Sequence, residues 1–300
     1  MELGISAGAG IEADLRTRCA EAPQRAVTEH ILDLADQAGY GAALIDAVTE
    51  GSGEASVITW PQFAHMVRAA ARGLSRRGLR EADTAGILVQ DAVSHVVAVH
   101  AVRAAGAVAV PIRPSQTAAD IAAQLKQGRA RLLITSAALA ELAIRAAERS
   151  WVRQVFAFGE AEGTTPFGSL LRTARHGQLP VNGSASHNDS NGHNGHGGGG
   201  PAAPQVLDLA GPGPDGLGLG ADGSAVRLTH RDVVVAAPPC GDPDAYTSLL
   251  DLALAAGATI VATPLPQVTA AVGVYKGTAA IVPRGTDVPV LPTERVFTLN

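Results

Sequence analysis

The stretch of this chain with the most chemical potential is the glycine-rich segment GPGPDGLGLGADGS at residues 211–224. Within it, Gly218, Gly220 and Gly223 are spaced so that consecutive backbone N–H groups can turn toward one point. Such a cradle of N–H groups binds phosphate. Ser224 follows directly, and Thr229 supplies a second hydroxyl a few residues later. We take the glycines as a candidate phosphate cradle.

The same glycines also fit the dinucleotide-binding pattern, Gly-x-Gly-x-x-Gly. That pattern requires a strand directly before the first glycine and a helix that opens on the last. Here the run Gly211–Pro214 separates the preceding strand from the loop, and residues 225–229 have the composition of a strand. In so glycine-rich a segment, we interpret the dinucleotide match as coincidence.

Histidine offers two further kinds of chemistry. His230 stands next to Thr229 and near Asp232, which is the order expected around a general base, but no nucleophile lies on a recognisable turn. The position favours the start of a helix instead. His187, His193 and His196 could bind a metal, but nothing in their glycine- and asparagine-rich surroundings would hold them in a fixed geometry. We therefore assign no catalytic residue and no metal ligand.

The elements around these candidates follow a regular alternation of strands and helices. Thr59 and Gln62 have the spacing of a capping box, with Pro61 in the first turn, and predict a helix over residues 60–76. Uninterrupted apolar strands on both sides of a helix indicate parallel pairing and burial on both faces. The predicted elements of this first half are a helix that ends at Gly39; strands at 43–45, 56–59, 85–89, 107–112, 131–135 and 154–158; and helices at 60–76, 94–104, 117–127, 137–148 and 167–175.

The composition changes abruptly near residue 180, and it predicts how the chain is divided. Residues 181–204 are rich in Gly, Asn, Ser and His and cannot bury enough apolar surface to order themselves, so they predict a flexible linker. We expect a loose leader at 1–26, an α/β subdomain at 27–180 and an incomplete second α/β subdomain at 205–300. In the second subdomain we predict strands at 206–210, 225–229, 258–262 and 279–283, helices at 230–237 and 246–256, and no clear element after residue 286.

The bulk composition excludes several classes of partner. The net charge is −5 and the pI is about 6.0, so there is no electrostatic basis for binding nucleic acid or an anionic membrane. The apolar runs are too short to cross a bilayer.

Cys19 and Cys240 lie far apart in the sequence and have no metal-ligand spacing. We expect free thiols and a cytoplasmic protein of unknown oligomeric state.

Several segments, in order, resemble the adenylate-forming, AMP-binding acyl-CoA synthetases, and 4-coumarate–CoA ligases in particular. They are ITWPQFAHMVRAAARGLSRRGLREAD, GILVQDAVSHVVAVHAVRAAGAVAVPIRP, TAADIAAQLKQGRARLLITS, VRLTHRDVVVAA and LLDLALAAGATIVATP. The resemblance implies a doubly wound, mostly parallel α/β sheet, the N-terminal subdomain of such a ligase. It also implies a family that uses ATP, magnesium and CoA. The assignment to a nucleotide phosphate loop, which the resemblance likewise implies, covers Gly218, Gly220, Gly223, Ser224 and Thr229.

The resemblance also shows what the loop has lost. The family's loop reads Ser-Gly-Thr-Thr-Gly-x-Pro-Lys-Gly and aligns with residues 217–225 of this chain. Leu219 and Gly220 replace the hydroxyl residues, Ser224 replaces the lysine, and Asp222 adds a negative charge where a triphosphate would approach. The family's Tyr-Gly-x-Thr-Glu segment and its ribose-binding Asp are not found, and its C-terminal lysine would lie past residue 300.

Two functions are therefore open from the sequence. One is a non-catalytic relative, a pseudoenzyme that binds no cofactor and acts as a binding or regulatory partner of a full-length ligase or another protein. The other is a residual ATP-dependent acid–CoA ligase or acyl-adenylate synthase. A nucleotide-binding module without chemistry is a third reading. The open edge of an incomplete sheet is a predicted place for association.

Overall fold

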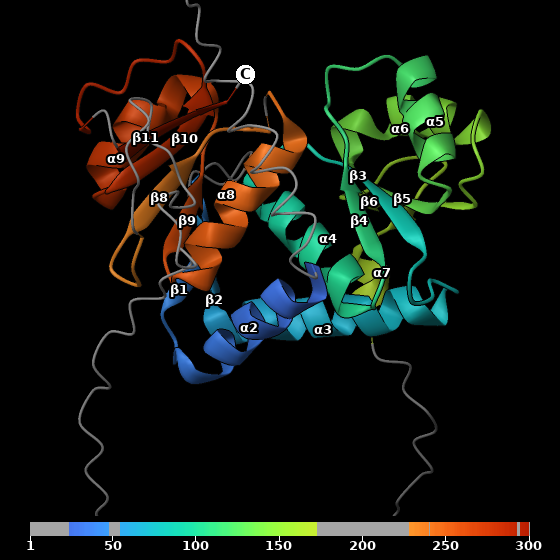
Figure 1. Cartoon of the computed structure of the whole chain (residues 1–300), viewed down its shortest axis with the longest axis horizontal. Coiled ribbons are helices and arrows are strands. Elements are labelled where there is room, and N and C mark those ends of the chain that lie inside the picture. The colour runs from blue at the N-terminus through green and yellow to red at the C-terminus, as the bar shows by residue number, and fades with distance from the viewer. Residues whose placement is uncertain (1–23, 48–54, 173–227, 240, 293–294, 300) are drawn as a thin grey trace, which may run out of the picture.

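The structure of the chain is a computed structural model that describes residues 24–47, 55–172, 228–239, 241–292 and 295–299. Two sheets stand apart from each other, and a layer of helices lies between them and beneath them (Figure 1). The elements before residue 173 are α2 (Gln24–Gln37), β1 (Ala42–Asp46), β2 (Ser56–Thr59), α3 (Trp60–Arg76), β3 (Thr84–Leu88), α4 (Ala92–Ala104), β4 (Val108–Pro111), α5 (Ala118–Gln127), β5 (Ala130–Ser136), η1 (Ala137–Leu139), α6 (Ala140–Glu148), β6 (Gln154–Phe158), β7 (Thr165–Pro166) and α7 (Gly168–Leu171).

The elements of the later part are β8 (Val233–Ala236), α8 (Pro243–Ala255), β9 (Thr259–Ala262), η2 (Leu265–Gln267), α9 (Val268–Tyr275), β10 (Ala279–Pro283) and β11 (Val296–Leu299). The sheets have the orders β4-β3-β5-β6-β7 and β11-β10-β8-β9-β1-β2. All pairs are parallel except β1 with β2. The predicted fold class, α/β with mostly parallel sheets, is confirmed.

Local signals fix the helix boundaries as the sequence predicts. The backbone N–H of Thr59 donates to Oε1 of Gln62 at 2.9 Å, which satisfies one free donor at the start of α3. Asp91 does the same for α4, because its carboxylate accepts from the N–H of Ser94 at 2.6 Å. Gly39, just past α2, has φ +65°, the left-handed conformation that glycine adopts without a steric penalty.

The predicted helix at residues 230–237 is wrong, because residues 233–236 form strand β8. Val233, Val234 and Val235 are β-branched, and β8 lies in the middle of a parallel sheet, where such side chains pack well. Strand β11 at the end of the chain was also not predicted. The predicted strands at 206–210 and 225–229 lie mostly outside the described residues, and so do Cys19, Cys240 and the linker histidines.

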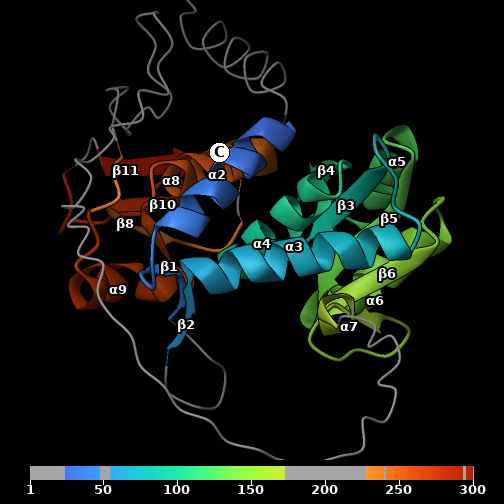
Figure 2. The same cartoon turned by 90° about the horizontal axis from the view of Figure 1, so that it is seen from below.

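Strands β1 and β2 join the sheet of the later strands, although the sequence placed them in the first subdomain. Leu44 pairs with Ile260 in β9, and the hydroxyl of Thr259 donates to the carbonyl of Ala42 at 2.8 Å across 217 residues of sequence. Figure 2 shows α3 running from β1 and β2, which belong to the six-stranded sheet, to the other sheet. The two halves of the chain are therefore interleaved rather than divided at the linker.

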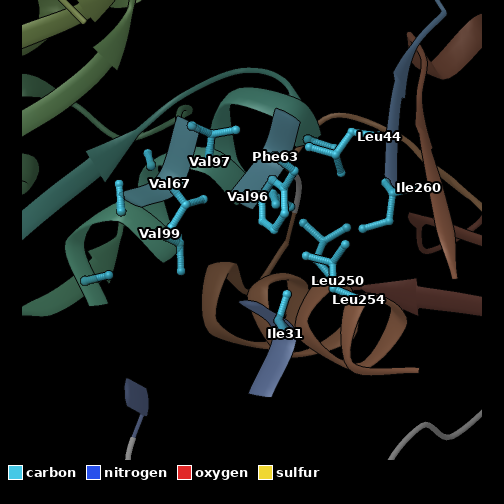
Figure 3. Packing of buried hydrophobic residues seen from close by; sticks show 14 of the residues in the cluster. Ile31, Leu44, Phe63, Val67, Val96, Val97, Val99, Leu250, Leu254 and Ile260 are labelled. Carbon is cyan, nitrogen blue, oxygen red and sulfur yellow. The ribbon is translucent and has the colours of Figure 1, made fainter. Parts of the chain in front are cut away.

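One apolar core fills the space between the helices and both sheets. Side chains of α2, α3, α4 and α8 meet those of β1 and β9 around Phe63, which has no exposed surface (Figure 3). Close packing extends to the end of α3, where a Cβ on Gly73 would stand 2.5 Å from the carbonyl oxygen of Leu170. No larger residue fits there without a backbone shift. Burial of this shared core makes the helix layer a single unit.

A polar seam crosses this core where α4 faces α8, and we call it the α4–α8 seam. It consists of His95, His100 and Arg103 on α4 with Thr247 and Asp251 on α8. Arg103 donates through Nη1 to Oδ2 of Asp251 at 2.7 Å, and only 7% of the Arg103 side chain is exposed. Nε2 of His95 lies 2.7 Å from the hydroxyl of Thr247. Buried polar groups destabilise a core unless they are paired, so these contacts fix α8 on α4 in one register.

We expect Asp251→Asn to lower the free energy of unfolding by about 3–5 kcal/mol, because it leaves the Arg103 charge buried without a carboxylate. The matched control is Asp36→Asn. Asp36 pairs with Arg68 at 2.6 Å, but the two side chains are 53% and 38% exposed, so its removal should cost less than about 1 kcal/mol. Urea denaturation of both variants measures the difference. Equal losses would show that the seam does not hold the helices together.

Candidate functional site

The predicted phosphate loop falls largely outside the described residues. Gly218, Gly220, Gly223 and Ser224 lie within residues 173–227, so their assignment to a vestigial nucleotide site stays a prediction. Thr229 is described, in the turn that leads into β8. The site is therefore built from this turn outward.

Thr229 and Asp232 form a closed turn. The backbone N–H of Thr229 donates to Oδ2 of Asp232 at 2.6 Å, and its hydroxyl donates to the same oxygen at 2.9 Å. Both polar groups of Thr229 that could meet a ligand are thus directed at a carboxylate of its own chain. Such side-chain to backbone bonds are typical of Ser, Thr and Asp in turns.

The other oxygen of Asp232 collects partners from distant strands. Oδ1 accepts from the hydroxyl of Thr278 at 2.8 Å and from Nη1 of Arg295 at 3.0 Å. Burial acts to raise the pKa of Asp232, but the hydrogen bonds from Thr278 and Thr229, together with the Arg295 charge, outweigh it and hold the pKa below its usual value. Asp232 is therefore an ionised, fully partnered carboxylate. We call this group the Asp232 clamp.

The clamp lies at the amino ends of the strands. Asp232 directly precedes β8, Thr278 precedes β10 and Arg295 precedes β11. Ligands of open parallel α/β sheets bind at the opposite edge, outside the carboxyl ends of the strands. The clamp aligns the starts of three neighbouring strands and has the geometry of a structural tie.

The carboxyl edge of the same sheet carries little that is charged in the part of the chain that the structure describes. The residues that directly follow β1, β8, β9 and β10 are Ala47, Ala237, Thr263 and Arg284. The hydroxyl oxygen of Thr263 is buried without a hydrogen-bond partner, and Arg284 is exposed. Of these four residues, Arg284 is the one that carries a positive charge.

The α4–α8 seam contains an arrangement that resembles a nucleophile, a base and an orienting acid. The hydroxyl of Thr28 lies 2.9 Å from Nδ1 of His100, and Nε2 of His100 lies 3.4 Å from Oδ1 of Asp251. Thr28 has no exposed surface and His100 has 1%, so no substrate reaches the hydroxyl. Burial lowers the pKa of His100 to about 3, with Arg103 adding to the effect. The arrangement is an internal hydrogen-bond network without access.

Sequence reasoning missed this network because its members come from segments far apart in the chain. Thr28 and His100 are separated by 72 residues, and Arg103 and Asp251 by 148. The available signal was the segment SHVVAVHAVRAA, where two histidines and an arginine interrupt an otherwise apolar helix. Polar residues on a helix that is apolar all round indicate a buried pairing, but they do not name the partner.

His230, the remaining candidate from the sequence, begins the turn before β8 instead of a helix. Tyr246 is a core residue whose hydroxyl donates to the carbonyl of Ala237 at 2.7 Å. Lys276 is exposed and ends α9 with φ +54°. Among the described residues, no group of His, Cys, Asp and Glu side chains has the geometry of a metal site, and no helix is long and apolar enough to span a membrane.

Comparison with known proteins shows which proteins this chain resembles in sequence. Residues 35–175 match the family model described as AMP-binding enzyme. The resemblance to the adenylate-forming ligases is confirmed. A protein of Oryza sativa subsp. japonica, 4-coumarate–CoA ligase-like 3, is 34% identical over 116 residues, which are 38% of this chain and 19% of that protein.

Solved structures agree on the fold. A long-chain-fatty-acid–CoA ligase from Archaeoglobus fulgidus superposes with a TM-score of 0.59 at 18% identity, over 86% of this chain and 51% of that one. A benzoate–CoA ligase from Burkholderia xenovorans LB400 gives 0.55 at 17%, over 88% and 53%. The chain is thus similar to AMP-binding enzymes in sequence over residues 35–175 and to acid–CoA ligases in fold, and it spans about half the length of these structures and a fifth of the rice relative.

We expect Asp232→Asn to destabilise the protein by about 2–3 kcal/mol, because it removes a charged acceptor and turns an amide donor toward the Thr229 or Thr278 donors. The control Asp120→Asn removes an exposed carboxylate in the first turn of α5 and should cost about 1 kcal/mol or less. Thermal unfolding compares the two. If the clamp did not tie the strands together, Asp232→Asn would lower the stability of the protein by only as much as the control does.

The buried histidines predict acid sensitivity. Burial lowers the pKa of both His95 and His100 to about 3, so the unfolded chain takes up protons below pH 6.5 while the native chain does not. Stability should therefore fall as the pH drops from about 6.5 toward 3, by about 2 kcal/mol per histidine at pH 5. Burial also raises the pKa of Asp251, against the effect of Arg103, and this carboxyl acts in the opposite direction.

The contribution of the histidines is isolated by variants. Urea unfolding at pH 7 and pH 5 should show a smaller pH dependence for His95→Gln and for His100→Gln than for the wild type. His65→Gln, at an exposed position on α3, should keep the wild-type dependence. If all of the variants kept the full pH dependence, the buried imidazoles would not be its source.

Proposed function

We propose that this chain is a non-catalytic relative of the AMP-binding acid–CoA ligases and that it acts as a binding or regulatory partner of a full-length ligase. The observation that carries the proposal is the loop sequence. Ser224 stands where the resemblance expects the lysine, and Asp222 adds a negative charge. Adenylyl transfer depends on positioned cations and hydrogen-bond donors at the phosphates, so this loop repels where it should stabilise.

The surroundings of Thr229 support the proposal. Thr229, the last residue of the candidate set, donates both its backbone N–H and its hydroxyl to Asp232, at 2.6 and 2.9 Å. These bonds belong to a clamp whose other members, Thr278 and Arg295, hold the starts of β10 and β11. A Thr229 hydroxyl that is committed to the clamp is not available to a phosphate.

The edges of the six-stranded sheet support a role in association. Strands β11 and β2 end the strand order, so each has one row of backbone N–H and C=O groups that no described strand pairs. Unpaired strand edges accept an added strand from another chain. A ligase partner that contributes such a strand would complete the sheet, which makes the open edge the proposed contact.

Labelled pyrophosphate exchange into ATP tests the catalytic half of the proposal. With magnesium and a panel of carboxylic acids, including 4-coumarate, benzoate and octanoate, we expect exchange at background for the wild type. We also expect background for Ser224→Lys, because the hydroxyls at positions 219 and 220 are still absent and Asp222 remains. A full-length 4-coumarate–CoA ligase serves as the positive control.

The same assay tests the regulatory half. Adding the chain in molar excess to the full-length ligase should change the exchange rate, while an equal amount of serum albumin should not. Acid-dependent exchange by the chain alone would establish the alternative, a residual acyl-adenylate synthase. No effect on the ligase, together with a monomer in sedimentation with it, would contradict the partner role.

A further inference from the structure

A groove of about 550 Å³ runs between α2, the second half of α3 and the end of α4. Figure 2 shows these three helices in the helix layer, and none of the residues that line the groove belongs to a strand. Its volume is in the range of small-molecule sites, which is about 300–1,000 Å³. The groove therefore shares no residue with the Asp232 clamp.

The wall of the groove on α3 carries a row of arginines. Arg68, Arg72 and Arg76 recur every four residues and so share one face of the helix. Glu29 is the one acidic residue among the described residues that line the groove. The lining therefore carries more positive than negative charge, and an anion is the ligand whose charge complements it.

The three arginines are not equivalent. Arg68 donates through Nη1 and Nη2 to both oxygens of Asp36, at 2.7 and 2.6 Å, so its fork is occupied. Arg76 donates through Nη2 to the carbonyl of Arg172 at 3.2 Å. Arg72 makes no hydrogen bond or ion pair with any described residue, and its side chain is exposed. Its guanidinium is the group in the row that is open to a ligand.

The floor of the groove is apolar and made of small side chains. Leu32, Ala71, Ala104 and Ala105 line it, and the three alanines leave the space that larger residues would fill. Thr28 on α2 also lines the groove, and its hydroxyl lies 2.9 Å from Nδ1 of His100 on α4. That buried bond holds α2 against α4 and keeps the groove at a fixed width, which is the preorganisation that a binding site needs.

We propose that this groove binds a small amphipathic carboxylate. The guanidinium of Arg72 matches a carboxylate through two parallel N–H···O bonds, and the apolar tail lies on the alanine floor. Both parts are needed, because an exposed arginine alone gives a weak ion pair and an alanine floor alone gives no specificity for charge. The inference does not depend on the proposed function, since it holds for a silent chain and for a catalytic one.

Isothermal titration calorimetry with sodium octanoate tests the proposal, and octanamide is the uncharged probe of the same length. We expect saturable binding of octanoate and binding of octanamide weaker by about tenfold or more. Arg72→Gln should weaken octanoate binding by a similar factor, and Arg72→Lys by less, because it keeps the charge and loses the fork. Arg149→Gln, which removes an exposed arginine at the end of α6, should leave it unchanged.

A second variant tests the floor without touching the charge. Ala104→Leu fills the groove from a half-buried position and should also weaken octanoate binding, with its circular dichroism spectrum kept as a check on folding. Octanoate binding that survives both Arg72→Gln and Ala104→Leu, or equal binding of octanamide, would overturn the proposal. So would saturable binding of a hexaglutamate peptide with no binding of octanoate, because that outcome assigns the arginine row to an acidic protein partner.

Discussion

The ion pair between Arg103 and Asp251 is the interaction on which the rest of the structure depends. It joins α4, the helix between β3 and β4, to α8, the helix between β8 and β9, through a contact at 2.7 Å, and so helps to link the two sheets. Both charges lie inside an apolar layer, where either one alone would be strongly destabilising. The pair therefore specifies one register of the helix layer, and every site discussed above is positioned by that layer.

The α2 helix shows how far this constraint reaches. His100, one turn before Arg103 on α4, bonds to Thr28 on α2 and so extends the seam from α8 to the first described helix. The α2 wall of the groove between α2, α3 and α4 therefore depends on this buried network, and so does the packing of α2 on α3. A hydroxyl, imidazole and carboxylate in sequence are normally interpreted as catalytic, but here the burial of Thr28 and His100 makes the arrangement structural.

In the six-stranded sheet, the polar side chains that stabilise the strands lie at the amino ends of the strands. Few polar side chains lie at the carboxyl ends, the edge where open parallel sheets bind their ligands. Asp232, Thr278 and Arg295 tie the amino ends of β8, β10 and β11, while Ala47 and Ala237 follow the carboxyl ends of β1 and β8. This distribution agrees with the proposed loss of nucleotide chemistry from the loop sequence. Under that proposal, the sheet serves as a scaffold for association and for binding a small ligand.

The sequence by itself determined the local elements and the resemblance to AMP-binding enzymes. Thr59 with Gln62 predicted the start of α3, the apolar run at 279–283 predicted β10, and the segments from ITWPQF to LLITS predicted the resemblance. These signals are carried by residues a few positions apart, so they are present before the chain folds. Only the tertiary structure decided that β1 pairs with β9, that residues 233–236 are a strand, and that Arg103 meets Asp251. Each of these depends on partners outside the local segment, the nearest being the pairing of Val233 with Thr259, and no local pattern of side chains encodes which distant segment will cover it.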